Sequence, residues 1–222
     1  MRIDGYKRHV LTDLDTDLIP AVGVTPANLA EAAVADQITA DLDAQQRTLG
    51  ELHIDRAYLS SSLVTDRDPD LQVFCKAFPV RNGPRFAKPA FHLDFDQGLL
   101  TCPNNITMPF TPGARVQFPA AVCQACPLRI QCTTSTRGRS VQIHPDERLL
   151  AEFRAAQQTP AGRARLRQRT AVEHTLAHIG RWQGRRARYL GQRKNLFDLR
   201  RVAVVHNLHV IARQPPPAKQ AA

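Results

Sequence analysis

The sequence predicts an α/β fold in which a β-rich segment interrupts alternating strands and helices. Residues 1–55 contain a hairpin pattern, an amphipathic helix pattern and a short strand pattern in succession. Residues 71–118 change to closely spaced short strands, and helical periodicity returns after Pro145. The 43% hydrophobic and 23% charged residues are ordinary for a globular protein and argue against disorder.

The N-terminal part begins with two predicted strands, 6–13 and 18–24, joined by a polar and acidic turn as in a hairpin. Thr25 followed by Pro26 is typical of a helix start, because a hydroxyl cap precedes a proline at the first helical position. Four apolar residues at helical spacing extend this pattern and predict a helix over residues 26–46: Leu29, Val34, Ile38 and Leu42.

A short strand is expected next, because Leu52 and Ile54 alternate with His53 and Asp55 after Gly50. A Ser-rich segment then indicates the start of another helix. Asp55 is therefore expected close to the C-terminal end of a strand.

The middle of the chain is predicted to be β-rich. Strands are expected over 71–78 and 91–95, and Asp96-Gln97-Gly98 is typical of a hairpin turn into a strand over 99–102. We therefore expect residues 1–70 to form the first part of the core and residues 71–145 to form an insertion.

Residues 146–214 are expected to form the helical second part of the core, followed by a disordered tail over 215–222. Helices are predicted through Gln158, over 162–181 and over 196–213, although the Val-rich middle of the last segment leaves a strand possible. The second helix has an apolar stripe made of Val172, Leu176 and Ile179.

Charge is distributed unevenly along the chain. Residues 1–100 hold ten basic and fifteen acidic side chains, a formal charge of −5, whereas residues 101–222 hold twenty and five, a formal charge of +15. A positive surface of this size favours nucleic acid as a partner. The chain has no apolar run long enough to span a membrane and no apolar signal core after Met1, so a cytoplasmic protein is expected.

Four of the five cysteines are close in sequence: Cys102, Cys123, Cys126 and Cys132. Thiols at this spacing in a turn-like segment of a cytosolic chain favour a structural zinc site over disulfides, with a set of buried thiols as the alternative. His144 is a possible substitute ligand. Cys75 lies in an apolar strand pattern and is expected in the core.

Four short sequence motifs resemble those of a known protein family. Gly5-Tyr6-Lys7-Arg8-His9-Val10, Val24-Thr25-Pro26-Ala27-Asn28, Leu52-His53-Ile54-Asp55-Arg56-Ala57-Tyr58 and Arg169-Thr170-Ala171-Val172-Glu173-His174 follow one another in this order. In these words the chain resembles the C-terminal portion of bacterial insertion-sequence transposases of the DDE type, in the group with a cysteine-containing insertion. The resemblance covers the chain from Tyr6 to about Arg213.

The resemblance implies an RNase H-like core in which three acidic residues bind two Mg2+ ions. Asp55 matches the second acidic residue and Glu173 the third, with Arg169 as part of the helix signature. The signature is only partly met, since Leu166 stands where Tyr is common and Gly180 stands where a basic residue is expected, next to Arg181.

The first acidic residue is expected to be absent, because the family places it on a strand before the Gly-Tyr-Lys word and Met1 lies only four residues before Gly5. In two-metal phosphoryl transfer a bridging carboxylate sets the spacing of the ions, so its loss predicts weak metal binding and a truncated, inactive form. We expect none of Asp4, Asp13 and Asp15 to replace it, because acidic residues are common in turns for turn chemistry alone.

Basic and aromatic residues are interleaved after Glu173, which favours phosphate contacts and base stacking over a merely solvated face. The expected DNA-binding residues are Arg169, Arg181, Trp182, Arg185, Arg186, Arg188, Arg193 and Lys194. Glu173 could alternatively be an ordinary ion-pair partner of Arg169, four positions earlier. His174 and His178 lie at metal-ligand spacing, but on a basic helix they are more typical of surface groups.

The sequence therefore predicts a transposase that acts on double-stranded DNA at element ends and at a target, by Mg2+-dependent hydrolysis followed by strand transfer. An intact relative could be a homo-oligomer. Two alternatives remain: a non-catalytic, zinc-stabilised DNA-binding remnant, and an unrelated zinc-containing nucleic-acid module. The Asp55 and Glu173 carboxylates are expected to converge on one solvent-reachable pocket if the transposase interpretation is right.

Overall fold

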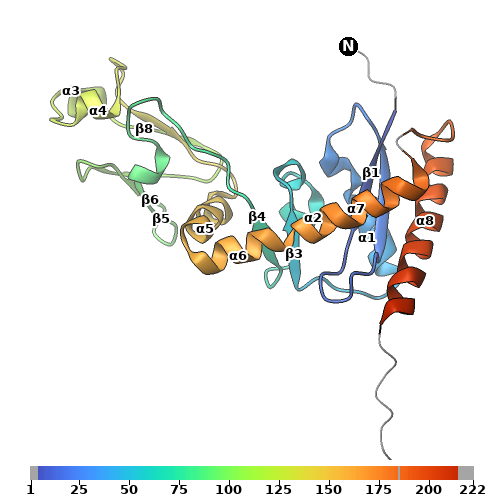
Figure 1. Cartoon of the computed structure of the whole chain (residues 1–222). Helices are drawn as coiled ribbons and strands as arrows, with labels where there is room; N and C mark the ends of the chain where they lie inside the picture. The colour runs from blue at the N-terminus through green and yellow to red at the C-terminus, as the bar shows by residue number, and fades with distance from the viewer. Residues whose placement is uncertain (1–4, 185, 215–222) are drawn as a thin grey trace, which may run out of the picture. The chain divides into compact units, whose positions relative to one another are not determined.

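The structure is a computed structural model that describes residues 5–184 and 186–214 (Figure 1). The chain forms two compact units. Unit 1 combines Met1–Lys76 with Pro160–Ala222, and unit 2 is the continuous segment Ala77–Thr159. Unit 1 is therefore built from two stretches of chain that are far apart in sequence.

Unit 1 contains two pairs of strands. Strands β1 (Tyr6–Leu11) and β2 (Ala21–Pro26) form the predicted antiparallel hairpin. Strands β3 (Glu51–Ile54) and β4 (Gln72–Cys75) run parallel, as expected for strands joined by a helical connection. In the part of the chain that the structure describes, each pair forms a separate two-stranded sheet.

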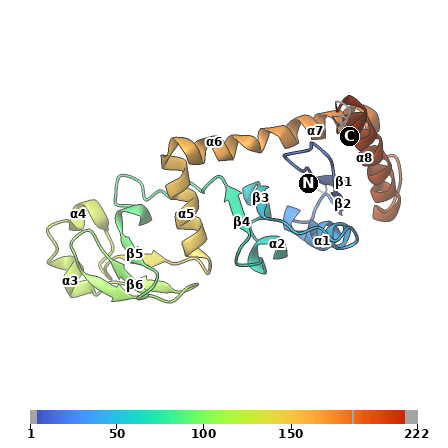
Figure 2. The ribbon, with the colours of Figure 1, turned by 90° about the horizontal axis from the view of Figure 1, so that it is seen from below.

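Helices cover both faces of these strands. In Figure 2, α6 (Pro160–Gln168) and α7 (Thr170–Gln183) lie on one side, and α1 (Ala35–Asp43) and α2 (Ser62–Thr65) lie on the other. The remaining helical elements of unit 1 are η1 (Glu31–Val34), η2 (Arg56–Tyr58) and α8 (Gln192–Arg213). This mixed α/β arrangement matches the predicted class, and the last segment is a helix, not a strand.

Two predicted helix boundaries are wrong. Thr25 and Pro26 belong to β2, where Thr25 is buried and Pro26 pairs with Tyr6, so the first helical turn starts only at Glu31. Pairing with β1 satisfies the backbone here and overrides the local helix-start signal. The helix predicted over 162–181 is two helices, α6 and α7, which are separated at Arg169.

The apolar core of unit 1 has two parts. The face of β2 that carries Val22 and Val24 packs with Ile179 of α7 and with Leu199 and Val202 of α8. The opposite side of the hairpin contributes Ala21 to a second cluster with Val34, Ile38 and Leu42. Cys75 is 1% exposed in β4, which confirms the predicted core position, and burial raises the pKa of its thiol to about 11.

Unit 2 is built from short antiparallel strands. A three-stranded sheet contains β5 (His92–Asp94), β6 (Leu99–Thr101) and β7 (Thr107–Pro109), and a second pair contains β8 (Arg115–Gln117) and β9 (Ser140–Gln142). The predicted turn lies between β5 and β6, with Gly98 at a positive φ of 66°. The helical elements are η3 (Lys88–Ala90), α3 (Ala120–Gln124), α4 (Arg129–Cys132) and α5 (Glu147–Gln158).

One apolar cluster joins both sheets of unit 2. It is formed by Phe91, Leu100, Val116, Phe118, Val141 and Ile143. Gly138 is required next to this cluster, because a Cβ atom at its φ of 86° would lie 2.5 Å from the carbonyl oxygen of Phe118.

None of the helices formed by residues 5–184 and 186–214 combines the length and the apolar character that crossing a bilayer requires.

Candidate active site

Asp55 directly follows β3, as the sequence predicts. Its side chain accepts a hydrogen bond from the backbone N–H of Ala57 at 3.4 Å and so caps the short helix η2. The carboxylate is 55% exposed. Asp55 therefore stands at the C-terminal end of a parallel strand, the end at which α/β proteins commonly place functional side chains.

Glu173 lies in the first turn of α7, one turn after Arg169. The Arg169 guanidinium contacts both acidic residues: Nη2 lies 3.1 Å from Glu173 Oε1, and Nη1 lies 3.6 Å from Asp55 Oδ2. Glu173 is 60% exposed. The two carboxylates, 118 positions apart in sequence, thus converge on one arginine at the surface of unit 1.

A large cavity of about 880 Å³ lies next to this cluster. We call it the β1–β3 groove, because residues 8–11 of β1 and residues 51–54 of β3 line it. Asp55 and Arg169 also line the groove, whereas Glu173 is not among its lining residues.

Asp13 and Asp15, considered as replacements for the first acidic residue, lie in the turn between β1 and β2. Asp13 accepts hydrogen bonds from the backbone N–H groups of Asp15 and Thr16 and pairs with Arg47 at 2.9 Å. Burial by itself would raise the pKa of Asp13, but these hydrogen bonds lower it below the ordinary value. Asp4 lies outside the described residues. Among the described residues, no group of three or more His, Cys, Asp and Glu side chains is arranged to hold a metal ion.

A buried hydrogen-bonded histidine lies beside the groove and was not assigned a role from sequence. His9 Nδ1 lies 2.7 Å from the Tyr58 hydroxyl, and Nε2 lies 2.8 Å from Thr25 Oγ1. Burial lowers the pKa of His9 to about 4 and raises the pKa of Tyr58 to about 12. His9 is therefore neutral at pH 7, and this pairing across β1, β2 and η2 could not be deduced from the spacing of the residues.

The basic stretch lies at the junction of α7 and α8. Arg181 and Trp182 end α7, while Arg193 and Lys194 lie in the first turn of α8, and all four are exposed. Arg186 and Arg188 are exposed in the connection, where the Arg188 guanidinium donates to the Trp182 carbonyl oxygen at 3.3 Å. Arg185 lies outside the described residues. These cations flank the N-terminus of α8, whose free N–H groups favour phosphate.

Trp182 is surrounded by histidines that sequence analysis did not connect with it. Its ring lies 5.8 Å from that of His178, 6.3 Å from that of His206 and 5.3 Å from that of His209. The four-residue spacing of His178 and Trp182 is a detectable signal, but the two histidines of α8 become neighbours only through the packing of α7 on α8.

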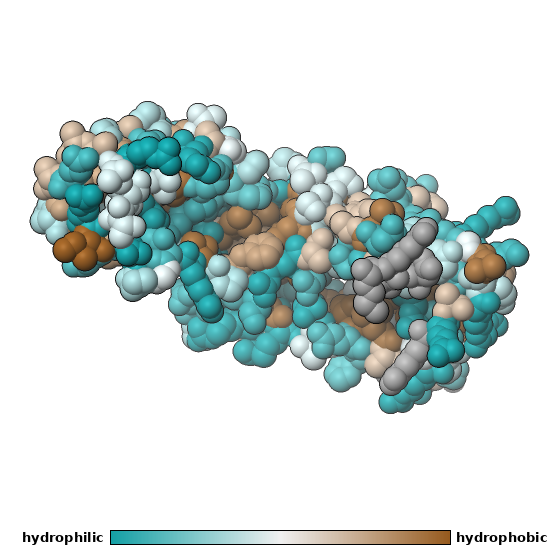
Figure 3. All heavy atoms as spheres, turned by 90° about the horizontal axis from the view of Figure 1, so that it is seen from above, coloured by the Kyte–Doolittle hydropathy of each residue, from teal (hydrophilic) through white to brown (hydrophobic). Residues whose placement is uncertain are grey.

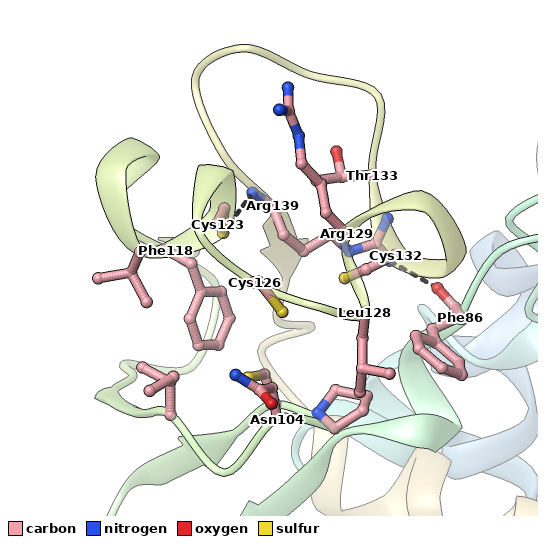
Figure 4. A pocket seen from close by; sticks show the side chains of 14 residues that line it. Phe86, Asn104, Phe118, Cys123, Cys126, Leu128, Arg129, Cys132, Thr133 and Arg139 are labelled. Atoms are coloured by element: carbon pink, nitrogen blue, oxygen red, sulfur yellow. Dashed lines mark hydrogen bonds between the residues drawn. The ribbon is translucent and has the colours of Figure 1, made fainter.

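The four clustered cysteines line one small pocket of unit 2, of about 30 Å³. Figure 4 shows the Cys123, Cys126 and Cys132 sulfur atoms facing this pocket, and Cys102 lines it as well. Burial raises the pKa of the Cys132 thiol, and the three neighbouring cysteines act in the same direction. The Arg139 backbone N–H donates to Cys123 Sγ at 3.4 Å.

The predicted zinc site is not supported as a formed metal centre, because the described residues contain no metal-holding group. The cysteines are all free thiols. His144 lines a different cavity, with Nδ1 accepting from the Asp146 backbone N–H, so it does not join the cysteines.

Residues 101–212 match the sequence family described as Transposase DDE domain, which is half of the chain. The matched segment contains Glu173, the four clustered cysteines and the basic stretch, while Asp55 lies before it. No curated protein and no solved structure matches the chain.

Proposed function

We propose that this chain, which belongs to the family of transposases with a DDE domain, retains in Asp55 and Glu173 two of the Mg2+ ligands with which an intact relative would carry out DNA hydrolysis and strand transfer at insertion-sequence ends. The observation that carries the proposal is the contact of both carboxylates with the single Arg169 guanidinium. An RNase H-like core belongs to the same proposal, supported by an antiparallel and a parallel strand pair between two helix layers.

The ion pairs of Arg169 with Asp55 and Glu173 are weak enough for a ligand to replace them. Ion pairs between exposed side chains contribute only about 0–1 kcal/mol to stability, so the Arg169 cluster is not needed to hold unit 1 together. The same small energy lets a divalent ion displace the guanidinium. Two carboxylates with water are a common protein contribution to Mg2+ binding, so the residues present fit one ion.

When bound, Mg2+ would activate the attacking oxygen and stabilise the leaving oxygen of the phosphodiester. The chain's own part is to hold the ion with Asp55 and Glu173 and to orient Asp55 through its hydrogen bond with η2. With the ion bound, Arg169, which pairs with both carboxylates here, would be free to contact a DNA phosphate. The exposed cations Arg181, Arg186, Arg188, Arg193 and Lys194, together with Trp182, bind the duplex.

We further propose that the 222-residue chain is inactive in cleavage. A bridging third carboxylate sets the ion spacing in two-metal chemistry, and the described residues place no third carboxylate with Asp55 and Glu173. The purified chain should therefore bind DNA and bind Mn2+ weakly, without nicking or joining a DNA duplex in the presence of Mg2+.

The test separates this proposal from a purely DNA-binding remnant. Asp55→Asn and Glu173→Gln should each abolish Mn2+ binding, followed by electron paramagnetic resonance, and leave duplex affinity within about twofold, because neither carboxylate contacts the duplex. Mn2+ binding that is unchanged in both variants would favour the DNA-binding remnant. Mg2+-dependent cleavage by the parent chain would show that the site is complete.

Zinc binding by Cys102, Cys123, Cys126 and Cys132 is a separate proposal, supported by the shared pocket of the four thiols. A metal ion would have to displace thiol protons, so zinc affinity should fall with decreasing pH. Metal analysis of reduced protein should find about one equivalent of zinc, lost in Cys123→Ser and retained in the control Cys75→Ser. Zinc-free protein would exclude the site.

A homo-oligomer is also proposed, on the basis of one exposed apolar face of α8. This face consists of Phe197, Val204, Leu208 and Ile211, which recur at helical spacing and are all more than half exposed. Light scattering should show a dimer that becomes monomeric in Leu208→Glu.

A further inference from the structure

We infer that a cationic groove in unit 2 binds an unpaired DNA strand, with phosphates on its basic side chains and a base stacked on Phe78. The choice of DNA rests on the proposed function. The groove itself lies in the other unit from Asp55 and Glu173, so the site does not depend on whether those carboxylates hold Mg2+. It is also separate from the cations of α7 and α8 that the proposed function assigns to the duplex.

The groove has a volume of about 500 Å³, and all of its lining residues belong to unit 2. We call it the β9 groove, because the whole of β9 lines it. The other walls come from the chain between β4 and η3, from η3 and from α5. Cavities of about 300–1,000 Å³ take ligands of the size of a drug molecule, so there is room for a nucleotide of one strand and not for the width of a duplex.

The charge of the β9 groove favours a polyanion. Every charged side chain that the structure describes along it is basic: Arg81, Lys88, Arg139 and Arg154. Lys88 and Arg154 share the Glu147 carboxylate, at 2.6 and 2.7 Å, but Glu147 is only 2% exposed and does not line the groove. Four cations against one carboxylate leave a formal charge of +3, which attracts a phosphate backbone.

Two of these cations have no carboxylate partner among the described residues. Arg81 is exposed in the segment after β4. Arg139 is held in place by neutral groups, since its Nη2 donates to the Phe86 carbonyl oxygen at 3.1 Å and its guanidinium lies 5.4 Å from the centre of the Phe91 ring. The positive charge of both side chains is therefore available to a ligand.

The outer edge of β9 adds neutral donors. Backbone hydrogen bonds at 2.8 and 2.9 Å join the β8 side of the pair to the Arg139 carbonyl oxygen and to the Ile143 N–H. In the antiparallel pattern, Ser140 and Gln142 therefore direct their backbone groups away from β8. Both residues line the groove, and no described residue accepts a hydrogen bond from either N–H. Backbone N–H groups are frequent partners of nucleic-acid phosphates.

His144 supplies a further donor at the end of β9. Its Nδ1 accepts a hydrogen bond from the Asp146 N–H at 3.0 Å, so the neutral ring carries its proton on Nε2. His144 is exposed and lines the groove, and its Nε2–H has no acceptor in the part of the chain that the structure describes. This N–H can therefore donate to a phosphate oxygen.

Phe78 gives the groove an aromatic surface, since it lines the groove and is 50% exposed. On the face that Figure 3 shows, most of the surface is hydrophilic and apolar side chains occur in separate patches. Cations next to an exposed aromatic ring are typical of sites for single-stranded nucleic acid, because a base stacks on the ring while its phosphate binds a cation. A duplex hides the faces of its bases, so Phe78 favours an unpaired strand.

The probe is a fluorescein-labelled oligothymidylate of about ten nucleotides, within the range that one single-strand-binding fold covers. Fluorescence anisotropy should show saturable binding to the full chain. Phe78→Leu removes the aromatic face and should weaken binding at least about fivefold, whereas Phe78→Trp keeps a stacking surface and should bind at least as tightly as the parent chain. Equal affinity of all three proteins would overturn the inference.

A matched pair of variants tests the cations. Arg81→Ala should lower the slope of log affinity against log salt by about 0.7, the value for one phosphate contact on a single strand. Arg137→Ala removes the same charge from an exposed position of unit 2 that does not line the groove, and it should leave the slope unchanged. A slope that is the same in Arg81→Ala and in the parent chain would contradict the inference.

Photo-cross-linking locates the strand. An oligonucleotide with 5-iodouracil in place of thymine should cross-link to Phe78, as identified by mass spectrometry. Cross-links only to Trp182 or Tyr189 would assign the strand to the junction of α7 and α8, and displacement by oligoglutamate of equal length would assign the groove to an acidic peptide; either result overturns the inference. Asp55→Asn should bind the oligonucleotide like the parent chain, so failure of this site and failure of Mn2+ binding are separate results.

Discussion

Each unit contains a cluster in which carboxylates pair with basic side chains, but the carboxylate of one cluster is buried and those of the other are exposed. In unit 2, Glu147 is 2% exposed and is held by Lys88 Nζ at 2.6 Å and by Arg154 Nη2 at 2.7 Å. In unit 1, Asp55 and Glu173 are more than half exposed and share Arg169 at 3.6 and 3.1 Å. Both clusters are ion pairs between carboxylates and basic side chains, but only the carboxylates of unit 1 are accessible to solvent.

The difference in burial separates an ion-pair cluster that stabilises the fold from one whose carboxylates can bind a ligand at little cost in stability. Removing one partner of a buried ion pair costs about 3–5 kcal/mol, since the remaining charges stay in a poorly solvated place. Removing one partner of an exposed pair costs about 0–1 kcal/mol. The Glu147 cluster therefore stabilises unit 2, whereas the carboxylates of the Arg169 cluster are available to bind a metal ion.

The largest expected effect follows from Glu147→Gln. This variant should lower the free energy of unfolding of unit 2 by about 3–5 kcal/mol, because Lys88 and Arg154 lose the carboxylate between them. Urea denaturation followed by hydrogen exchange across residues 77–159 measures the loss. Glu173→Gln is the matched control and should change stability by less than about 1 kcal/mol. Equal losses would remove the distinction between the two clusters.

Acid should weaken the two units in different pH ranges. Burial lowers the pKa of His9 to about 4, so as the pH falls the unfolded chain binds this proton before the folded chain does. Between pH 7 and pH 5, unit 1 should lose about 2 kcal/mol, and His9→Gln should remove most of this dependence.

Unit 2 should keep its stability over the same range. Burial would raise the pKa of Glu147, but the Lys88 and Arg154 hydrogen bonds and the His144 N–H lower it below the ordinary value. The stability that this group provides is therefore present above the ordinary carboxyl pKa and is lost only as the pH falls below it. Hydrogen exchange at pH 5 that opens unit 2 before unit 1 would contradict this order.

The smallest expected effect concerns DNA. Arg193→Ala with Lys194→Ala should reduce the slope of log affinity against log salt by up to about two, one for each lost phosphate contact. Arg200, on the same helix, is paired with Asp41 at 2.5 Å, so Arg200→Ala should change the slope less. Equal slopes for the double variant and the parent chain would place these cations outside the DNA-binding surface.

Sequence patterns predicted the elements whose signals are local. Strand patterns found the β1–β2 hairpin and β3, helical character found α5, and apolar character found α8, for which a strand had been left possible. The position of Asp55 after β3 follows from the same local pattern. The start of the first helix was misplaced because Thr25 is held in β2 by pairing with β1 and by His9, a contact between residues distant in sequence.

The contacts of the candidate site depend on packing. Arg169 and Glu173 are one helical turn apart, so their pairing is predictable from spacing. The contact of Arg169 with Asp55 requires α7 to cross the end of β3, and the β1–β3 groove exists only once β1 and β3 have been placed. Neither arrangement can be derived from the order of residues alone.

The central claim is that Asp55 and Glu173 hold one divalent ion, and iron-directed cleavage of the backbone tests it most directly. Fe2+ bound in place of Mg2+, with ascorbate and peroxide, cuts the chain close to the ion, and mass spectrometry locates the cuts. The claim predicts cuts near both residue 55 and residue 173, suppressed by excess Mg2+ and absent in Asp55→Asn and in Glu173→Gln. Cuts near only one of these positions, or cuts that persist in both variants, would contradict it.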